Sequence, residues 1–358
     1  MSIDSLGTRE RVLLKAAHGA PIVDADLKGL AFDHAPLAAA ILHRLDLGGV
    51  SFRGADLREA VFDDCSLVGA AFDGALLRGA TVHNCRADRT SWRGSNLRNS
   101  RIVKSSLQGA DFGGADLNLA AFVQCDLEDA TASGAAIDRC AFSEVRLVRA
   151  RIDRVAFRQV TFAACTLDGA AFDGSSFELV VFHKTPMRER SFAGQTWSGC
   201  QFMECDLSGA DFSSAVIRQS NFKGATLDGA RFMAAQASNA VFVDATGIAC
   251  DFSRAQLTQA LFIGSRWQRS RFDGAALRQA FFTKGSLESC SLRDSDLTYA
   301  DFAQASLLSC DLRGSQLFRA NLHRVDDAGS QIGDRSMALG TKPELERAET
   351  WRPTPAPA

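Results

Sequence analysis

The stretch at residues 202–232, FMECDLSGADFSSAVIRQSNFKGATLDGARF, has a large apolar residue at every fifth position. An α-helix repeats its face every 3.6 residues and a β-strand every 2, so a period of five belongs to neither element alone. The period indicates a repeat architecture. The apolar positions are Phe202, Leu207, Phe212, Ile217, Phe222, Leu227 and Phe232.

The same phase runs without a slip from Leu27 to Leu322, which makes 60 positions that we call central. A phase kept over this length predicts that the central side chains fill one continuous interior. Only four central positions lack a large apolar side chain: Ala87, Ala132, Ala237 and Gly247.

The position two residues before each centre selects small side chains, and all ten cysteines fall on it. Free cysteine commonly behaves as a small buried hydrophobe, and the spacing contains no CxxC or zinc-ligand cluster. We therefore interpret the cysteines as interior packing residues, with a redox or metal role as the alternative.

Small residue, Asp or Asn, then Leu or Phe recurs in words such as Ala-Asp-Leu at 55–57 and 115–117, with near copies at 205–207 and 295–297. This pattern resembles the pentapeptide-repeat family over about residues 25–325. The resemblance implies an all-β fold, a right-handed quadrilateral parallel β-helix. Each five-residue repeat would make one side of a coil, and four repeats would close the coil. The repeats would therefore form about 15 coils.

Phenylalanine prevails at centres ending in 2 and leucine at those ending in 7, which is a period of ten. In a coil of 20 residues, this alternation predicts phenylalanine on two opposite sides. Of 25 phenylalanines, only Phe281 and Phe318 lie off the central phase. The aromatic residues are therefore expected to be core and not a binding platform.

We expect the chain to divide into an N-terminal capping helix (1–20), the pentapeptide-repeat β-helix (21–325), and a C-terminal short helix with a Pro-rich tail (326–358). In the first helix we expect Thr8 to be the cap, with one apolar face. Thr341 to Glu344 has the spacing of a capping box for the second helix. The expected apolar faces are Leu13, Leu14 and Ala17 in the first helix, and Leu345, Ala348 and Trp351 in the second.

Residues 183–199 break the small-residue rule, because Thr185, Arg190 and Gln195 take three successive small positions. Burying an unpaired arginine is costly. We expect this segment to bulge outward or kink the rod while keeping the five-residue spacing of the central positions. It is either a tolerated surface loop or an excursion that contacts a partner.

No chemistry-bearing motif is present, and no metal or cofactor is expected. The formal net charge of −2 does not suggest a nucleic-acid binder, and no apolar run reaches membrane-spanning length. A column of four histidines is interpreted as solvated surface: His43, His83, His183 and His323. The sequence therefore predicts a soluble, cytoplasmic protein that is not an enzyme.

One outward group is apolar. Val241, Leu261 and Phe281 precede successive centres on one side, and Val243 and Ile263 follow two of these centres. We call these five residues the apolar stripe. Contiguous exposed apolar patches often mark association surfaces. The alternative is ordinary decoration of a sheet by β-branched residues.

A second outward group is basic. Residues 139–158 carry six arginines against Glu144 and Asp153, a local excess of four positive charges. The group is either a solvated structural face or a site for an acidic partner. Its members are Arg139, Arg146, Arg149, Arg151, Arg154 and Arg158.

The sequence favours a non-enzymatic protein-interaction scaffold or adaptor with a protein partner, including a homodimer through the apolar face or a rod end. The resemblance implies two alternatives: an accessory factor of a type VI secretion system, or a DNA mimic that binds DNA gyrase. DNA mimicry needs a dense negative field, whereas the charges here nearly balance. Candidate contact residues are Val241, Val243, Leu261, Ile263, Phe281, Arg146, Arg149, Arg151, Arg154, Arg190 and Trp351.

Overall fold

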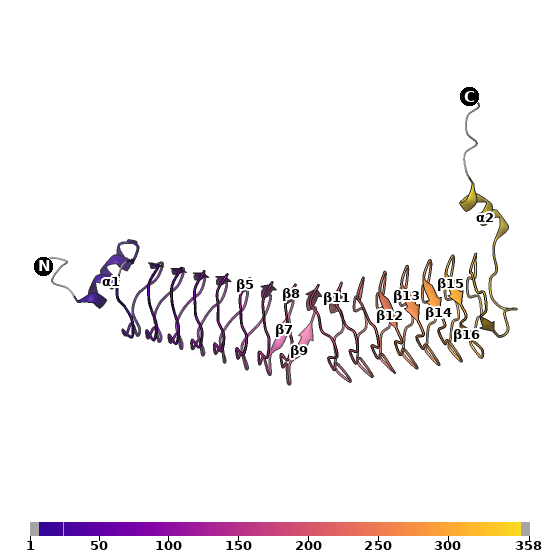
Figure 1. Ribbon diagram of the computed structural model, residues 1–358, viewed down its shortest axis with the longest axis horizontal. Helices are drawn as coiled ribbons and strands as arrows, with labels where there is room; N and C mark the ends of the chain where they lie inside the picture. The colour runs from indigo at the N-terminus through magenta and orange to yellow at the C-terminus, as the bar shows by residue number, and fades with distance from the viewer. Residues whose placement is uncertain (1–6, 24, 352–358) are drawn as a thin grey trace, which may run out of the picture. The chain divides into compact units, whose positions relative to one another are not determined.

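The computed structural model describes residues 7–23 and 25–351, and its contacts divide the chain into two compact units, Met1–Pro186 and Met187–Ala358. Both units are parallel β-solenoids, with about 15 turns in total (Figure 1). Residues pair in parallel with those 20 positions further on, as Phe62 does with Val82. Four five-residue words therefore close one coil, as the sequence predicts.

In the first unit one side of the coil forms a continuous parallel sheet, in the order β1-β2-β3-β4-β5-β6-β8-β10. A second side carries the pair β7 and β9. The sheet strands are β1 (Ile41–His43), β2 (Val61–Asp63), β3 (Thr81–His83), β4 (Arg101–Val103), β5 (Ala121–Val123), β6 (Ala141–Ser143), β8 (Thr161–Ala163) and β10 (Val181–His183); the pair is β7 (Ala156–Arg158) and β9 (Ser176–Glu178).

In the second unit the longest sheet lies on another side and has the order β12-β13-β14-β15. β16 pairs with β17, and most of the other coils are joined by single-residue parallel bridges with the same 20-residue register. The strands of this unit are β11 (Gln201–Met203), β12 (Thr246–Ile248), β13 (Arg266–Gln268), β14 (Ser286–Glu288), β15 (Ser306–Leu308), β16 (Asp311–Leu312) and β17 (Gln331–Ile332).

Most corners of the coil are tight turns. At one of them the N–H of Ala75 donates to the carbonyl of Phe72 at 3.0 Å, and Gly74 between them has φ 65°. A positive φ at this position defines a type II turn and favours glycine or asparagine. Each five-residue repeat therefore consists of a short extended side and a corner.

Aromatic stacks fill the interior. Phe52 and Phe72, one coil apart, stack with centroids 5.1 Å apart, whereas Phe52 and Phe62 meet edge-to-face at 5.9 Å across the coil. In the second unit, Phe222 stacks on Phe242 at 4.9 Å and meets Phe232 edge-to-face at 5.7 Å. The predicted placement of phenylalanine on opposite sides is thus confirmed.

The first helix, α1 (Thr8–Ala17), precedes the first coil, but two details of its prediction are wrong. Its N-cap is Gly7, and no side chain caps it. Its buried residues are Val12 and Ala16, spaced one helical turn apart, while Ala17 is exposed. Leu13 and Leu14 are only half-buried.

The second helix, α2 (Pro343–Thr350), has no buried residue, so the expected apolar face does not cover the last coil. Its N-cap is Lys342 without a side-chain bond, which makes the capping-box prediction wrong. The Thr341 hydroxyl instead accepts a hydrogen bond from the N–H of Arg324 at 3.0 Å. The segment before α2 pairs with the last coil, because the N–H of Leu339 donates to Ala320 at 2.8 Å.

The segment 183–199 keeps the five-residue count, with Met187, Phe192 and Trp197 buried at centres. Arg190 is half-buried and Gln195 is exposed, so these two side chains do not fill the interior, as expected. Thr185 differs from the expectation: it is fully buried, and its hydroxyl donates to the carbonyl of Phe162 at 3.1 Å.

Candidate protein-interaction surface

The apolar stripe lies on adjacent coils of the second unit. Parallel bridges join Val241 to Leu261 and Leu261 to Phe281. The carbonyl of Leu261 accepts the N–H of Phe242 at 2.6 Å, and the carbonyl of Phe281 accepts that of Phe262 at 2.7 Å. The backbone therefore presents the three side chains in one outward column.

A packed core supports the stripe from beneath. The rings of Phe242 and Phe262 stack with centroids 4.9 Å apart, and those of Phe262 and Phe282 at 4.6 Å. Phe281 is 39% exposed beside the fully buried Phe282, whereas the other four stripe residues are half-buried. The stripe is thus an apolar surface backed by a packed aromatic core.

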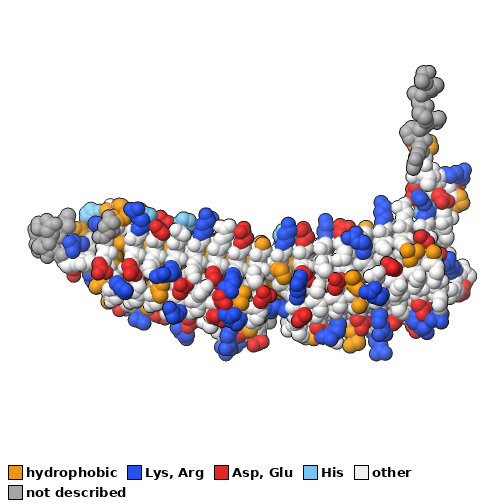
Figure 2. All heavy atoms as spheres, in the orientation of Figure 1, with side chains coloured by type: hydrophobic (Ala, Val, Ile, Leu, Met, Phe, Trp, Pro, Cys, Tyr) orange, Lys and Arg blue, Asp and Glu red, His pale blue; other side chains and the backbone are white. Residues whose placement is uncertain are grey.

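Polar residues bound the stripe at both ends. The bridge partner before Val241 is Asn221, and the one after Phe281 is Asp301. On another side of the same unit, the guanidinium of Arg231 lies 2.7 Å from the Asp211 carboxylate one coil earlier. Figure 2 shows charged side chains of both signs intermixed on the visible face of each unit.

The arginine cluster does not present an unopposed positive charge, because acidic residues one coil earlier pair with it. Arg146 bonds to Glu128 and lies 3.2 Å from Asp126, and Arg149 lies 2.8 Å from Asp129. The hydrogen bond from Arg146 lowers the pKa of the Glu128 carboxyl. The predicted excess of four charges is therefore corrected: it counted only neighbours in sequence.

The remaining cluster arginines are also engaged. Arg151 lies 3.4 Å from Asp153, and the guanidinium of Arg154 donates to the Ser133 hydroxyl at 3.4 Å. Arg158 lies 3.2 Å from Glu178 on the paired strand, and Arg139 lies 3.0 Å from Asp138. A role for this face in binding an acidic partner stays a prediction.

Trp351 follows α2 and is 73% exposed. The helix is tied to the last coil by Glu349, which lies 3.0 Å from Arg324 and 3.2 Å from His323. The N–H of Lys342 donates to Nδ1 of His323, so the Nε2–H faces the Glu349 carboxylate. His323 is only 2% exposed, so its assignment to the solvated surface is wrong.

An exposed aromatic group was not among the predicted contact residues. The rings of Tyr299 and Phe318 meet edge-to-face at 5.7 Å, and the guanidinium groups of Arg278 and Arg319 lie 5.9 and 5.7 Å from the Tyr299 ring. Phe318 was visible in the sequence as an off-phase aromatic, and Tyr299 is the only tyrosine. Their proximity follows from the coil, which places residues about 20 apart on adjacent turns.

The cysteines confirm the packing interpretation, since all ten are free and buried. Burial raises the pKa of the Cys140 and Cys250 thiols to about 12. Within residues 7–23 and 25–351, no group of three or more His, Cys, Asp or Glu side chains could hold a metal ion. Among these residues, no helix is long and apolar enough to cross a membrane.

Two histidines of the predicted column share one carboxylate. Asp63 lies between His43 and His83, with Nδ1–O distances of 2.9 and 2.7 Å. The hydrogen bond from His83, with a second from His43, lowers the pKa of Asp63. This ladder pairs surface groups on adjacent coils.

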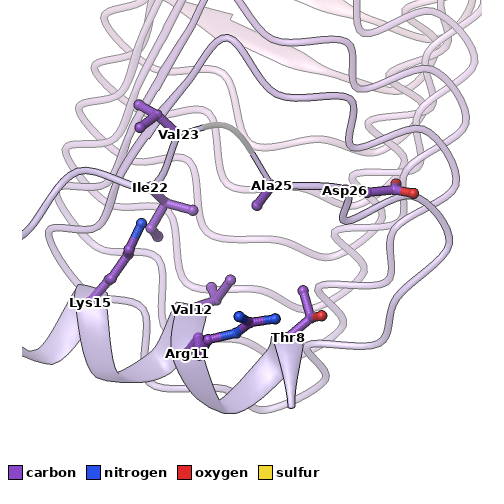
Figure 3. Close-up of a pocket in the computed structure, with 8 residues that line it drawn as sticks. All are labelled: Thr8, Arg11, Val12, Lys15, Ile22, Val23, Ala25 and Asp26. Carbon is purple, nitrogen blue, oxygen red and sulfur yellow. The ribbon is translucent and has the colours of Figure 1, made fainter. Parts of the chain in front are cut away.

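A hollow of about 280 Å³ lies between α1 and the first coil (Figure 3). Val12 and Ile22 line it together with Arg11, Lys15 and Asp26. The described lining residues include no histidine or cysteine. We assign this hollow to the junction of helix and solenoid.

Comparison with known families agrees with the fold. A model of pentapeptide repeats (8 copies) matches residues 40–79, 75–112, 105–143, 250–288 and 286–324. A model of the pentapeptide repeat region matches residues 135–212 and 195–266. The chain therefore belongs to the pentapeptide-repeat family. No curated protein sequence matches it.

Solved structures of similar fold include QnrB1, a plasmid-mediated fluoroquinolone resistance protein. It is 16% identical, covering 75% of this chain and 98% of its own, with a TM-score of 0.26. HetL is involved in heterocyst differentiation regulation in the cyanobacterium Nostoc sp. strain PCC 7120. It is 17% identical, and the match covers 83% of this chain and 87% of HetL, with a TM-score of 0.17. A pentapeptide repeat protein from the Arabidopsis thaliana thylakoid lumen is 24% identical. The match covers 42% of this chain and 81% of that protein, with a TM-score of 0.15.

Proposed function

We propose that this protein is a non-enzymatic protein-interaction scaffold that binds protein through the apolar stripe. The exposed Phe281 next to the buried Phe282 supports this proposal, because an outward phenylalanine contributes nothing to the interior. Contiguous apolar residues on a rigid, otherwise polar surface are typical of association sites. Extended repeat proteins commonly use such faces to bind partners.

The test compares capture by the wild type with capture by a stripe variant. The tagged full-length chain is used as bait in native lysate, beside the double variant Leu261→Asp with Phe281→Asp. We expect the variant to lose at least about tenfold of the captured protein, because two carboxylates would have to be desolvated in the contact.

A matched control is Met233→Asp, which places the same charge at another exposed apolar residue of this unit, 48% exposed. Capture by this control should equal that of the wild type. If the double variant captures as much as the wild type, the stripe is decoration and the proposal fails.

The two family-level alternatives give different captured proteins, a secretion-system component or a topoisomerase. The Arg231–Asp211 pair and the alternating bridges Asp211, Arg231, Asp251 and Arg271 weaken the DNA-mimic alternative, because cations interrupt the acidic column. A supercoiling assay with excess protein tests it directly: inhibition or protection of gyrase would favour that alternative over the scaffold.

A further inference from the structure

We propose that the apolar stripe is occupied by a second copy of this chain, packed antiparallel about a two-fold axis that passes over Leu261. The inference rests on the proposed function, since it names the protein that covers the stripe. Its basis is the order of charges along the coils of the second unit.

A two-fold axis running along the strand direction exchanges the coils on either side of Leu261. It places the coil of Val241 against the coil of Phe281 in the second copy, while Leu261 and Ile263 meet their own equivalents. Isologous contacts of this kind require one surface to complement itself. The stripe does so at four of its five residues, because Val241 faces Phe281 and Leu261 and Ile263 face their own equivalents, whereas Val243 faces Thr283.

The corner residues beside the stripe carry charges of opposite sign at positions that the proposed axis relates to each other. Asp244 and Lys284 lie one coil before and one coil after Gly264, and all three occupy the same corner of the coil. The proposed axis therefore places Asp244 of each copy opposite Lys284 of the other. Both side chains are exposed, and neither forms a salt bridge within residues 7–23 and 25–351.

A second pair repeats the pattern two coils from the axis. Lys223 follows Phe222 on one side of the centre, and Asp301 precedes Phe302 on the other. The axis brings the coil of Lys223 over the coil of Asp301, and a lysine side chain spans the two residues of offset. Opposite charges at the rim favour this register.

A third pair occupies the corner three coils away, where Glu204 and Arg324 flank the same centre. Arg324 already bonds to Glu349 of α2, and α2 stands to one side of the last coil (Figure 1). With the axis over Leu261, α2 would lie beside the start of the partner's second unit. These seven coils span about 30 Å at the usual strand spacing, so the contact is small and the dimer reversible.

Charge reversal tests the register. Sedimentation equilibrium of the full chain should show a monomer–dimer equilibrium. Asp244→Lys and Lys284→Asp should each weaken it roughly tenfold, since each creates two like-charge contacts. The double variant Asp244→Lys with Lys284→Asp should restore it to within about twofold. The control is Arg254→Asp, which reverses the charge of an exposed corner residue on another side of the coil. It should leave the monomer–dimer equilibrium unchanged.

Chemical cross-linking tests the axis. The ten native cysteines are buried, so Leu261→Cys adds a single accessible thiol per chain. A bis-maleimide spanning about 10 Å, the spacing of packed sheets, should link two copies through it. Gln256→Cys, exposed on another side of the same coil, should not cross-link.

A chain that stays monomeric at all concentrations overturns the inference, as does a dimer that all of these variants leave unchanged. If the chain is monomeric and Leu261→Asp with Phe281→Asp still abolishes capture of another protein, the scaffold function holds and the second copy is wrong. If dimerisation and capture both survive the stripe variant, both proposals fail.

Discussion

The indole N–H of Trp92 donates to the hydroxyl of Thr90 at 2.7 Å, and both residues are fully buried. The hydroxyl in turn donates to the carbonyl of Ala87 at 2.7 Å. The same relay recurs where Trp267 donates to Ser265 at 2.8 Å. A tryptophan inside this coil is thus matched by a polar residue two positions earlier.

Replacing Thr90 with valine should lower the free energy of unfolding by about 1–3 kcal/mol, because the buried indole N–H loses its acceptor without any loss of volume. Urea unfolding followed by circular dichroism measures this change. Thr90→Ser keeps the hydroxyl and is the control. A valine variant as stable as the serine variant would show that the relay contributes nothing.

The five-residue repeat made the coil predictable, because a single period assigns each side chain to the interior or to the surface. The sequence alone therefore places Phe281 outward and the cysteines inward. It did not reveal the Trp92–Thr90 relay, although the words Thr-Ser-Trp and Ser-Arg-Trp contain its signal. In these segments a hydroxyl-bearing residue occupies the position that selects small side chains.

Contacts between coils were harder to predict. Arg146 finds Asp126 and Glu128, which are 20 and 18 residues away, so a charge count over neighbours in sequence missed them. The C-terminal cap failed for a local reason. Thr341 has the spacing of a capping residue, but the coil offers its hydroxyl the free N–H of Arg324 instead.

Ala132 is a central residue that leaves a small void of about 20 Å³ among Phe112, Ile152 and their neighbours. Ala132→Val should raise the free energy of unfolding by roughly 0.5–1 kcal/mol, because it adds apolar carbons to unfilled space. Ala132→Phe exceeds the space and should cost about 1–3 kcal/mol. Urea midpoints of the two variants should therefore shift in opposite directions; shifts in the same direction would refute the void.

Gly247 is the opposite case, because Trp267 fills the space in front of it. A Cβ at residue 247 would lie 2.7 Å from the Trp267 ring and would also meet the Cys250 sulfur. Gly247→Ala should therefore cost about 1–3 kcal/mol of stability by overpacking. The matched double variant Gly247→Ala with Trp267→Leu should recover part of that loss relative to Trp267→Leu alone. Simple additivity in this double-mutant cycle would contradict the steric account.

The buried thiols make stability depend on alkaline pH. Burial raises the pKa of Cys165 to about 11 and that of Cys140 and Cys250 to about 12, from an ordinary value of 9.0. The folded chain therefore keeps protons that the unfolded chain loses. Stability should be fully present below pH about 9 and fall between pH about 9 and 12.

Two measurements check this pH dependence. Urea midpoints recorded from pH 8 to 11 should decline, and the decline should be smaller in Cys140→Ala with Cys250→Ala, which removes two of the titrating groups. Iodoacetamide at pH 8 should leave Cys140, Cys165 and Cys250 unmodified in the folded chain, because they are buried and their raised pKa keeps them protonated, whereas the thiolate is the reactive form. The variant Gln256→Cys, with its exposed thiol, is the positive control, and labelling of Cys140 or Cys250 at the same rate would disprove their burial.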